Sequence, residues 1–190
     1  MSISNATKLF IRFSLGKIGT AMPYTQSLSS ENPGYIVILI DQSGSMMNSF
    51  GGATGGTKAE ECAKAVNNVL QIMILSCTKG FDIKNRCDIS VLSYGASGNT
   101  AKNAFNGDLA TKLFVTIQDL SENCLKYETV KMKEFDGFAE TEFDEEIPIW
   151  IEPVASDGTP MAAAFEMAYD LIDKWTKSHE ASFPPIVINI

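Results

Sequence analysis

A carboxylate and two hydroxyls stand close together in the run Asp41-Gln42-Ser43-Gly44-Ser45. This run directly follows the apolar segment Tyr35 to Ile40. Carboxylate and hydroxyl oxygens are hard ligands of the kind that Mg²⁺, Mn²⁺ and Ca²⁺ prefer. Asp41, Ser43 and Ser45 therefore predict a divalent-cation site. The alternative is a polar turn in which the two serines only satisfy backbone groups.

The elements around this turn predict an α/β fold. The apolar segment before it is typical of a strand that is buried on both faces of a parallel sheet. We expect a helix from Lys58 to Cys77, where apolar residues recur at three- and four-residue spacing, and a strand from Cys87 to Tyr94. A strand, a helix and a strand in this order predict two parallel strands with a right-handed crossover. The turn at Asp41 would then lie at the carboxyl edge of the sheet, where open α/β sheets bind ligands.

The middle of the chain is less clearly patterned. Short strands are expected at Leu113 to Ile117 and at Val130 to Lys133, and an irregular or edge strand at Ile147 to Ile151. The acidic run Glu140 to Glu146 predicts a solvated loop, with a site for a cation or a basic partner as the alternative.

The C-terminal part returns to a clear pattern. Thr159-Pro160 is typical of a helix start. One apolar stripe follows it at helical spacing and consists of Met161, Phe165, Ala168, Ile172 and Trp175. The last segment, Ile186 to Ile190, is expected to be a strand.

The run Asp41 to Ser45 resembles the D-x-S-x-S signature of von Willebrand factor type A domains. Thr159 stands where that family supplies a threonine from a later loop, again just before a helix. Within this family the chain more closely resembles bacterial stand-alone domains. That likeness extends from Met22 to Ile190 and rests on the runs Met22 to Thr25, Leu39 to Met46, Pro148 to Pro153, Gly158 to Met161 and Pro184 to Ile190.

The resemblance implies a Rossmann-like fold of three layers around a central, mostly parallel sheet in strand order 3-2-1-4-5-6. It also implies a metal-ion-dependent adhesion site. Ser43 and Ser45 would bind the metal through their hydroxyls, Thr159 directly or through water, and Asp41 through water.

The family's last ligand is an aspartate just after the fourth strand, and it would fall just beyond Ile190. We therefore expect the domain to be C-terminally truncated. Asp157 lies close to Thr159 and could compensate, although the family does not use that position. The open edge of the strand at Ile186 is expected to cause self-association.

The resemblance implies a protein-interaction module in which a partner's Glu or Asp side chain completes the shell of a bound Mg²⁺, with Mn²⁺ or Ca²⁺ as alternatives. Two alternative functions stay open. One is an Mg²⁺-dependent hydrolase or phosphatase-like enzyme that uses Asp41 as nucleophile, and the other is a structural module with an empty metal site. Catalysis is not expected, because the sole histidine, His179, stands in a polar stretch expected at the surface and no G-x-S-x-G elbow is present. Gly51 to Lys58 has glycines at P-loop-like spacing but lacks the Gly-Lys-Ser/Thr ending.

Composition sets further limits. The chain has 190 residues, room for one domain, and a net charge of −8, which argues against nucleic acid as a partner. The four cysteines form no CxxC pair and are expected to be buried, reduced thiols. No segment is long enough to span a membrane, so a cytoplasmic protein is expected. Residues 1–21 are expected to be a leader outside a domain that covers 22–190.

Overall fold

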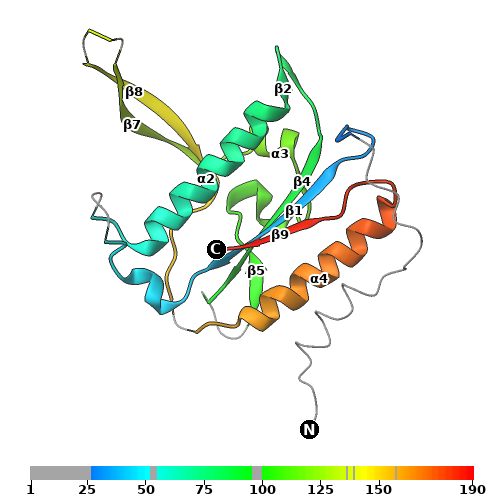
Figure 1. The fold of residues 1–190 in the computed structure, drawn as a ribbon. Helices are drawn as coiled ribbons and strands as arrows, with labels where there is room; N and C mark the ends of the chain where they lie inside the picture. The colour runs from blue at the N-terminus through cyan, green and yellow to red at the C-terminus, as the bar shows by residue number, and fades with distance from the viewer. Residues whose placement is uncertain (1–26, 52–54, 96–99, 136, 139, 157) are drawn as a thin grey trace.

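The computed structural model describes residues 27–51, 55–95, 100–135, 137–138, 140–156 and 158–190. The helices are α2 (Lys58–Cys77), α3 (Ile117–Glu122) and α4 (Met161–Ser178), with 3₁₀ turns at Gly44–Met47 and Gly107–Thr111. The strands are β1 (Gly34–Asp41), β2 (Thr78–Lys79), β3 (Asp82–Ile83), β4 (Cys87–Tyr94), β5 (Ala101–Asn103), β6 (Val115–Thr116), β7 (Lys126–Phe135), β8 (Glu140–Ile149) and β9 (Ile186–Asn189). The fold is therefore mixed α/β (Figure 1). The expected leader, 1–21, and the expected domain start at Met22 lie outside the described residues.

The central sheet has five strands in the order β5-β4-β1-β9, with β6 also paired to β4. β1 is parallel to β4 and to β9, which confirms that the strand at Ile186 lies beside Tyr35 to Ile40. The three longest strands of the sheet, β1, β4 and β9, are parallel as expected, and the short strands β5 and β6 are antiparallel to β4, which makes the sheet mixed. The reason is the short link between β4 and β5, because a parallel return needs a crossover of a dozen or more residues.

Helices lie on both faces of this sheet (Figure 1). Ile38 and Ile40 of β1 point into a buried cluster that includes residues of α2 and α3. Val37 and Leu39 point into a second buried cluster with residues of α4. This alternation along one strand explains why the whole run is apolar, since both faces are covered.

α2 begins and ends at the predicted residues. A capping box opens it, in which Thr57 Oγ1 accepts a hydrogen bond from Glu60 N (3.2 Å) and Glu60 Oε2 accepts one from Thr57 N (2.7 Å). Val66 and Leu70 of the predicted apolar stripe are fully buried, whereas Val69 is 43% exposed. Val69 therefore lies off the core-facing stripe.

α4 confirms the second predicted helix. Ala168, Ile172 and Trp175 are buried against the sheet, whereas Met161 at the first turn is 40% exposed. His179 follows the helix and is half-buried, not simply a surface residue, because its ring stacks on that of Trp175 with centroids 4.2 Å apart.

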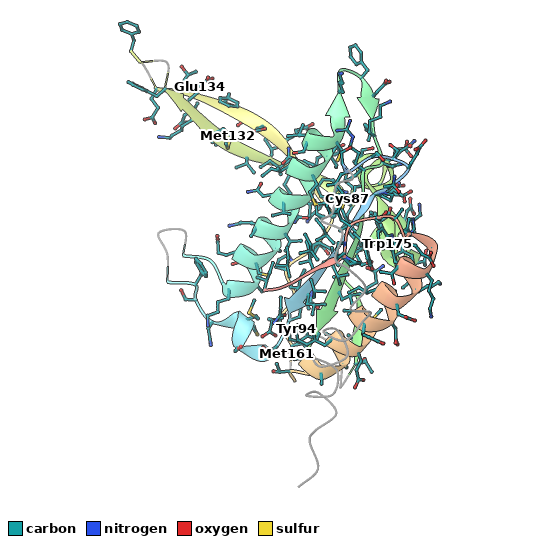
Figure 2. The ribbon with its side chains drawn as sticks, turned by 45° about the vertical axis from the view of Figure 1, so that its right-hand side comes forward. Cys87, Tyr94, Met132, Glu134, Met161 and Trp175 are labelled. Carbon is teal, nitrogen blue, oxygen red and sulfur yellow. The ribbon has the colours of Figure 1, made fainter. Side chains whose placement is uncertain are left out.

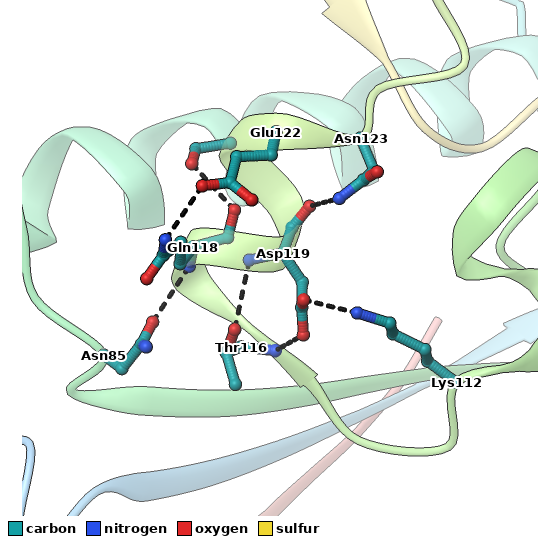
Figure 3. Close-up of polar contacts among 8 residues, drawn as sticks. Asn85, Lys112, Thr116, Gln118, Asp119, Glu122 and Asn123 are labelled. Carbon is teal, nitrogen blue, oxygen red and sulfur yellow. Dashed lines mark hydrogen bonds and ion pairs between the residues drawn. The ribbon is translucent and has the colours of Figure 1, made fainter.

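The strand expected at Leu113 to Ile117 is reduced to β6, because a helix begins at Ile117. Thr116 is the N-cap of α3: its Oγ1 accepts from Asp119 N (3.0 Å), and Asp119 Oδ2 accepts from Thr116 N (3.1 Å), as Figure 3 shows. Asn85 Oδ1 accepts from Gln118 N (2.9 Å) and holds the first turn. This capping box ends the strand after two residues.

The acidic run Glu140 to Glu146 is not a loop, so that prediction is wrong. It forms most of β8, which pairs with β7 in a two-stranded antiparallel ribbon. The register sets Lys131 opposite Asp144 and Lys133 opposite Glu142, and opposite charges across a ladder stabilise it. The strand predicted at Val130 to Lys133 is confirmed inside β7, while the strand predicted from Ile147 ends at Ile149.

Among the described strands none pairs with the outer edge of β9. Its side chains are exposed, with Ile186 at 56% and Ile188 at 41%. Self-association through this edge stays a prediction. All four cysteines are free thiols; Cys62 and Cys87 are buried as expected, and Cys77 and Cys124 are half-buried.

The core makes the protein sensitive to alkaline pH. Burial, aided by the charge of Asp88, raises the pKa of the Cys87 thiol to about 12, and burial raises the pKa of Tyr35 to about 12. The folded state therefore holds these protons more tightly than the unfolded state, so the stabilisation is complete below about pH 9 and is lost as pH rises toward 12.

We expect the free energy of unfolding to fall above about pH 9, by up to about 1.4 kcal/mol per pH unit for the thiol. Urea unfolding followed by circular dichroism between pH 8 and 11 measures this slope. Cys87→Ala should make the slope shallower, and an unchanged slope in that variant would contradict the assignment.

Candidate metal site

β1 places the Asp41 to Ser45 turn at the carboxyl edge of the sheet. Asp41 is the last residue of β1, and its N–H donates to Ile190 O (3.1 Å) beyond β9. The N–H of Gln42 donates to Tyr94 O (2.8 Å) at the end of β4. The turn is therefore held from both sides by the neighbouring strands. Its place at the carboxyl edge of the sheet is the one that the sequence pattern predicted.

The three predicted side chains of this turn lie together. Asp41 Oδ1 accepts a hydrogen bond from Ser43 N (2.7 Å). The hydroxyls of Ser43 and Ser45 are 3.0 Å apart, and the 3₁₀ turn at Gly44–Met47 holds the second serine close to the first. Ser43 is buried (5% exposed), Asp41 is half-buried and Ser45 is exposed, so the group opens toward solvent on one side.

A second loop comes to the same place. The N–H of Ser156 donates to Gln42 O (2.8 Å), which ties the segment before α4 to the turn. Gly158 O lies 3.0 Å from the position that a Cβ would occupy at Gly95, and Ser43 N lies 2.6 Å from it. Thr159 follows Gly158 and is exposed.

The structure thus brings the segment that carries Thr159 to the turn, although Thr159 and Asp41 are 118 positions apart in the sequence. The N–H of Met161 donates to Thr159 O (2.8 Å), so this threonine stands at the entrance to α4. Asp157, the fifth predicted ligand, lies outside the described residues.

The donor set fits a divalent cation, because hydroxyl and carboxylate oxygens are the ligands that Mg²⁺ and Ca²⁺ prefer. The 3.0 Å between Ser43 Oγ and Ser45 Oγ is the length of a hydrogen bond between the two hydroxyls, so it places both oxygens together but does not distinguish one ion from another. The described residues hold no group of three or more His, Cys, Asp or Glu suited to a metal, so the candidate site rests on hydroxyl oxygens and one carboxylate.

Asp41 supplies a negative charge that no described ion pair neutralises. Its effect extends to two neighbours. Burial raises the pKa of Cys62, and the charge of Asp41 raises it further. Burial and then Asp41 also raise the pKa of Tyr94, whose hydroxyl donates to Asn189 Oδ1 (3.0 Å). A bound cation would compensate this charge.

Gly95 is the residue of the site that the sequence pattern did not single out. Its φ is +109°, and a Cβ there would collide with the backbone of both loops. Its position directly after the predicted strand Cys87 to Tyr94 was an available signal, because ligand sites lie at such strand ends.

Comparisons with protein-family models, with characterised proteins and with solved structures found no match. In the part of the chain that the structure describes, no helix is both long and apolar enough to cross a membrane.

Proposed function

We propose that this chain is a von Willebrand factor type A-like module that binds a protein partner through a divalent cation. One observation supports this most directly: the hydroxyls of Ser43 and Ser45 and the carboxylate of Asp41 lie on one turn at the carboxyl edge of β1. The strand order β5-β4-β1-β9 agrees with the first four positions of the expected order 3-2-1-4-5-6. The convergence of the Thr159 segment on the turn also supports it.

In this proposal Ser43 and Ser45 bind the ion through neutral hydroxyls, and Thr159 adds a third hydroxyl. Asp41 holds the turn through Ser43 N and acts on the ion through water. The cation is then poorly neutralised by the protein, so a Glu or Asp side chain of the partner completes its shell. Mg²⁺ is the proposed ion, with Mn²⁺ and Ca²⁺ as alternatives.

We propose that the protein binds its partner in the cytoplasm and that it does not catalyse a reaction. A serine nucleophile needs a base within hydrogen-bond reach. The only histidine of the chain, His179, follows the last residue of α4, whereas the site lies at its first residue. An 18-residue helix is about 27 Å long, so His179 cannot act on Ser43. The net charge of −8 also disfavours nucleic acid as the partner.

The test is calorimetric titration of Mg²⁺ and Mn²⁺ into chelator-stripped protein. We expect saturable binding that is lost in Ser43→Ala, because the variant removes one direct oxygen ligand from a site with few of them. Ser121→Ala is the matched control, since Ser121 is a half-buried serine of α3 whose hydroxyl donates to Gln118 O. If the wild type takes up neither ion, the module is structural and the proposal fails.

A further inference from the structure

The β7–β8 hairpin projects from the body of the molecule (Figure 1). Each strand has ten residues, and every residue of β7 is exposed. Such a two-stranded ribbon is only marginally stable alone and gains stability when a third element covers one face.

The two faces of this hairpin differ in chemistry. The register places directly opposed residues on the same face, so Val130 lies with Glu145 and Met132 with Phe143. The face that we call the apolar face consists of Lys126, Glu128, Val130, Met132, Glu134, Thr141, Phe143, Glu145, Ile147 and Ile149. The opposite face carries Thr129, Lys131, Lys133, Glu140, Glu142, Asp144 and Glu146, besides Tyr127, Phe135 and Pro148.

The outer half of the apolar face is open to solvent. Val130 is 38% exposed, Met132 39% and Phe143 43%. Figure 2 shows Met132 and Glu134 well out on the projecting ribbon. This is a stripe of apolar side chains that the described part of the chain leaves uncovered.

Carboxylates interrupt and flank this stripe. Glu145 lies opposite Val130 in its middle, and Glu134 lies toward the tip. No described ion pair includes either of them, whereas Lys126 and Lys133 are already paired with glutamates. An occupant of this face must therefore bring its own cations alongside apolar side chains.

The stripe continues into a groove at the base of the hairpin. This groove has a volume of about 510 Å³. One wall is formed by Lys126, Glu128 and Ile149 of the apolar face, and the other by residues of α2 that include Lys64 and Asn67. The apolar face therefore looks toward α2, and an elongated partner segment lying on it would enter the groove.

We propose that the apolar face of the β7–β8 hairpin is a docking surface for a basic amphipathic helix of a partner protein. The apolar stripe of such a helix covers Val130, Met132 and Phe143, and its flanking Lys or Arg side chains pair with Glu134 and Glu145. A strand added to the hairpin edge would satisfy backbone groups but leave this face uncovered, so a helix fits it better. This surface is separate from the proposed metal site and does not depend on it.

The experiment uses the full chain in EDTA, so that its outcome is independent of the metal. The probe is a fluorescent 14-residue peptide of leucine and lysine with the leucines along one helical face. A peptide of the same composition, with the leucines scattered around the helix, controls for charge. Fluorescence anisotropy gives the Kd of each, and sedimentation velocity identifies complexes that contain a second copy of the chain.

We expect the amphipathic peptide to bind at least about tenfold more tightly than the scattered one. Phe143→Ser should weaken binding about tenfold, whereas Phe135→Ser, on the opposite face, should change it less than about twofold. Glu145→Gln and Glu146→Gln are a second matched pair, since they remove one charge from neighbouring residues on opposite faces. Only Glu145→Gln should weaken binding of the peptide. This variant leaves the apolar packing of the hairpin unchanged.

Equal losses within either pair, equal binding of the two peptides, or no binding at all would overturn the proposal. Binding that requires a second copy of the chain would also overturn it, because the face would then be an interface between copies.

Discussion

Asn67→Ala is expected to lower the free energy of unfolding by about 3–5 kcal/mol. Asn67 is a buried polar residue of α2, and its side chain makes three hydrogen bonds to the segment that follows β8. Its Oδ1 accepts from Trp150 N and from Ile151 N, both at 3.0 Å, and its Nδ2 donates to Ile151 O (2.9 Å). Alanine would leave two buried N–H groups and a carbonyl without partners, each of which costs about 1–3 kcal/mol.

The residue next to it provides a matched control. Asn68 is exposed, and its side-chain amide takes part in none of the hydrogen bonds found among the described residues. Asn68→Ala removes the same amide from the same helix and should change stability by no more than about 0.5 kcal/mol, since alanine favours a helix. Urea unfolding of both variants, followed by circular dichroism, measures the difference. Similar values for the two would show that the Asn67 amide does not hold the segment in place.

The hydrogen bonds of the Asn67 side chain to Trp150 and Ile151 also affect the candidate site. The segment that Asn67 holds leads on to Ser156, whose N–H donates to Gln42 O, and then to Thr159. Trp150 is fixed further by its own Nε1, which donates to Leu120 O (2.9 Å). The position of the Thr159 loop therefore depends on contacts made far from it, on α2 and α3.

The sequence pattern predicted the parts of the fold in which local pattern and tertiary burial agree. β1 and α2 are of this kind, because a strand buried on both faces is apolar throughout and a helix with one buried face has a period of 3.6. The apolar pattern of β1 also predicted that Asp41, Ser43 and Ser45, which follow directly after it, lie at an edge of the sheet. Their mutual distances could not be predicted, since they depend on the backbone hydrogen bond from Ser43 N to Asp41 Oδ1.

The failures occurred where long-range pairing decides the structure. Nothing in the run Glu140 to Glu146 predicts a strand until β7 is set opposite it, with lysines facing its carboxylates. The role of Asn67 could not be predicted from the sequence either, because its hydrogen-bond partners are 83 and 84 positions away. The antiparallel return from β4 to β5 has another cause, the short link between the two strands, which the apolar pattern of neither strand reveals.

Gly95→Ala is expected to lower both the stability of the fold and the affinity of the proposed metal site. Gly95 has a φ of +109°, which an alanine rarely adopts. Its new Cβ would also lie 2.6 Å from Ser43 N and 2.8 Å from Gln42 C, and both are backbone atoms that cannot rotate away. Together these should lower the free energy of unfolding by about 3 kcal/mol or more.

The control for the backbone strain alone is Gly137→Ala. Gly137 has a φ of +95°, and no atom lies within 4 Å of the position of its Cβ. That variant should lose only about 1–2 kcal/mol and keep its affinity for Mg²⁺. Gly95→Ala should bind Mg²⁺ at least about tenfold more weakly, because relief of the clash moves the Ser43 turn away from the strand end.

Calorimetric titration and urea unfolding of the two variants separate these effects. If Gly95→Ala binds Mg²⁺ with wild-type affinity while it is folded, the close approach of the two loops is not needed for the site. The ion would then be held by the Asp41 to Ser45 turn alone, and Thr159 would have no part in binding it.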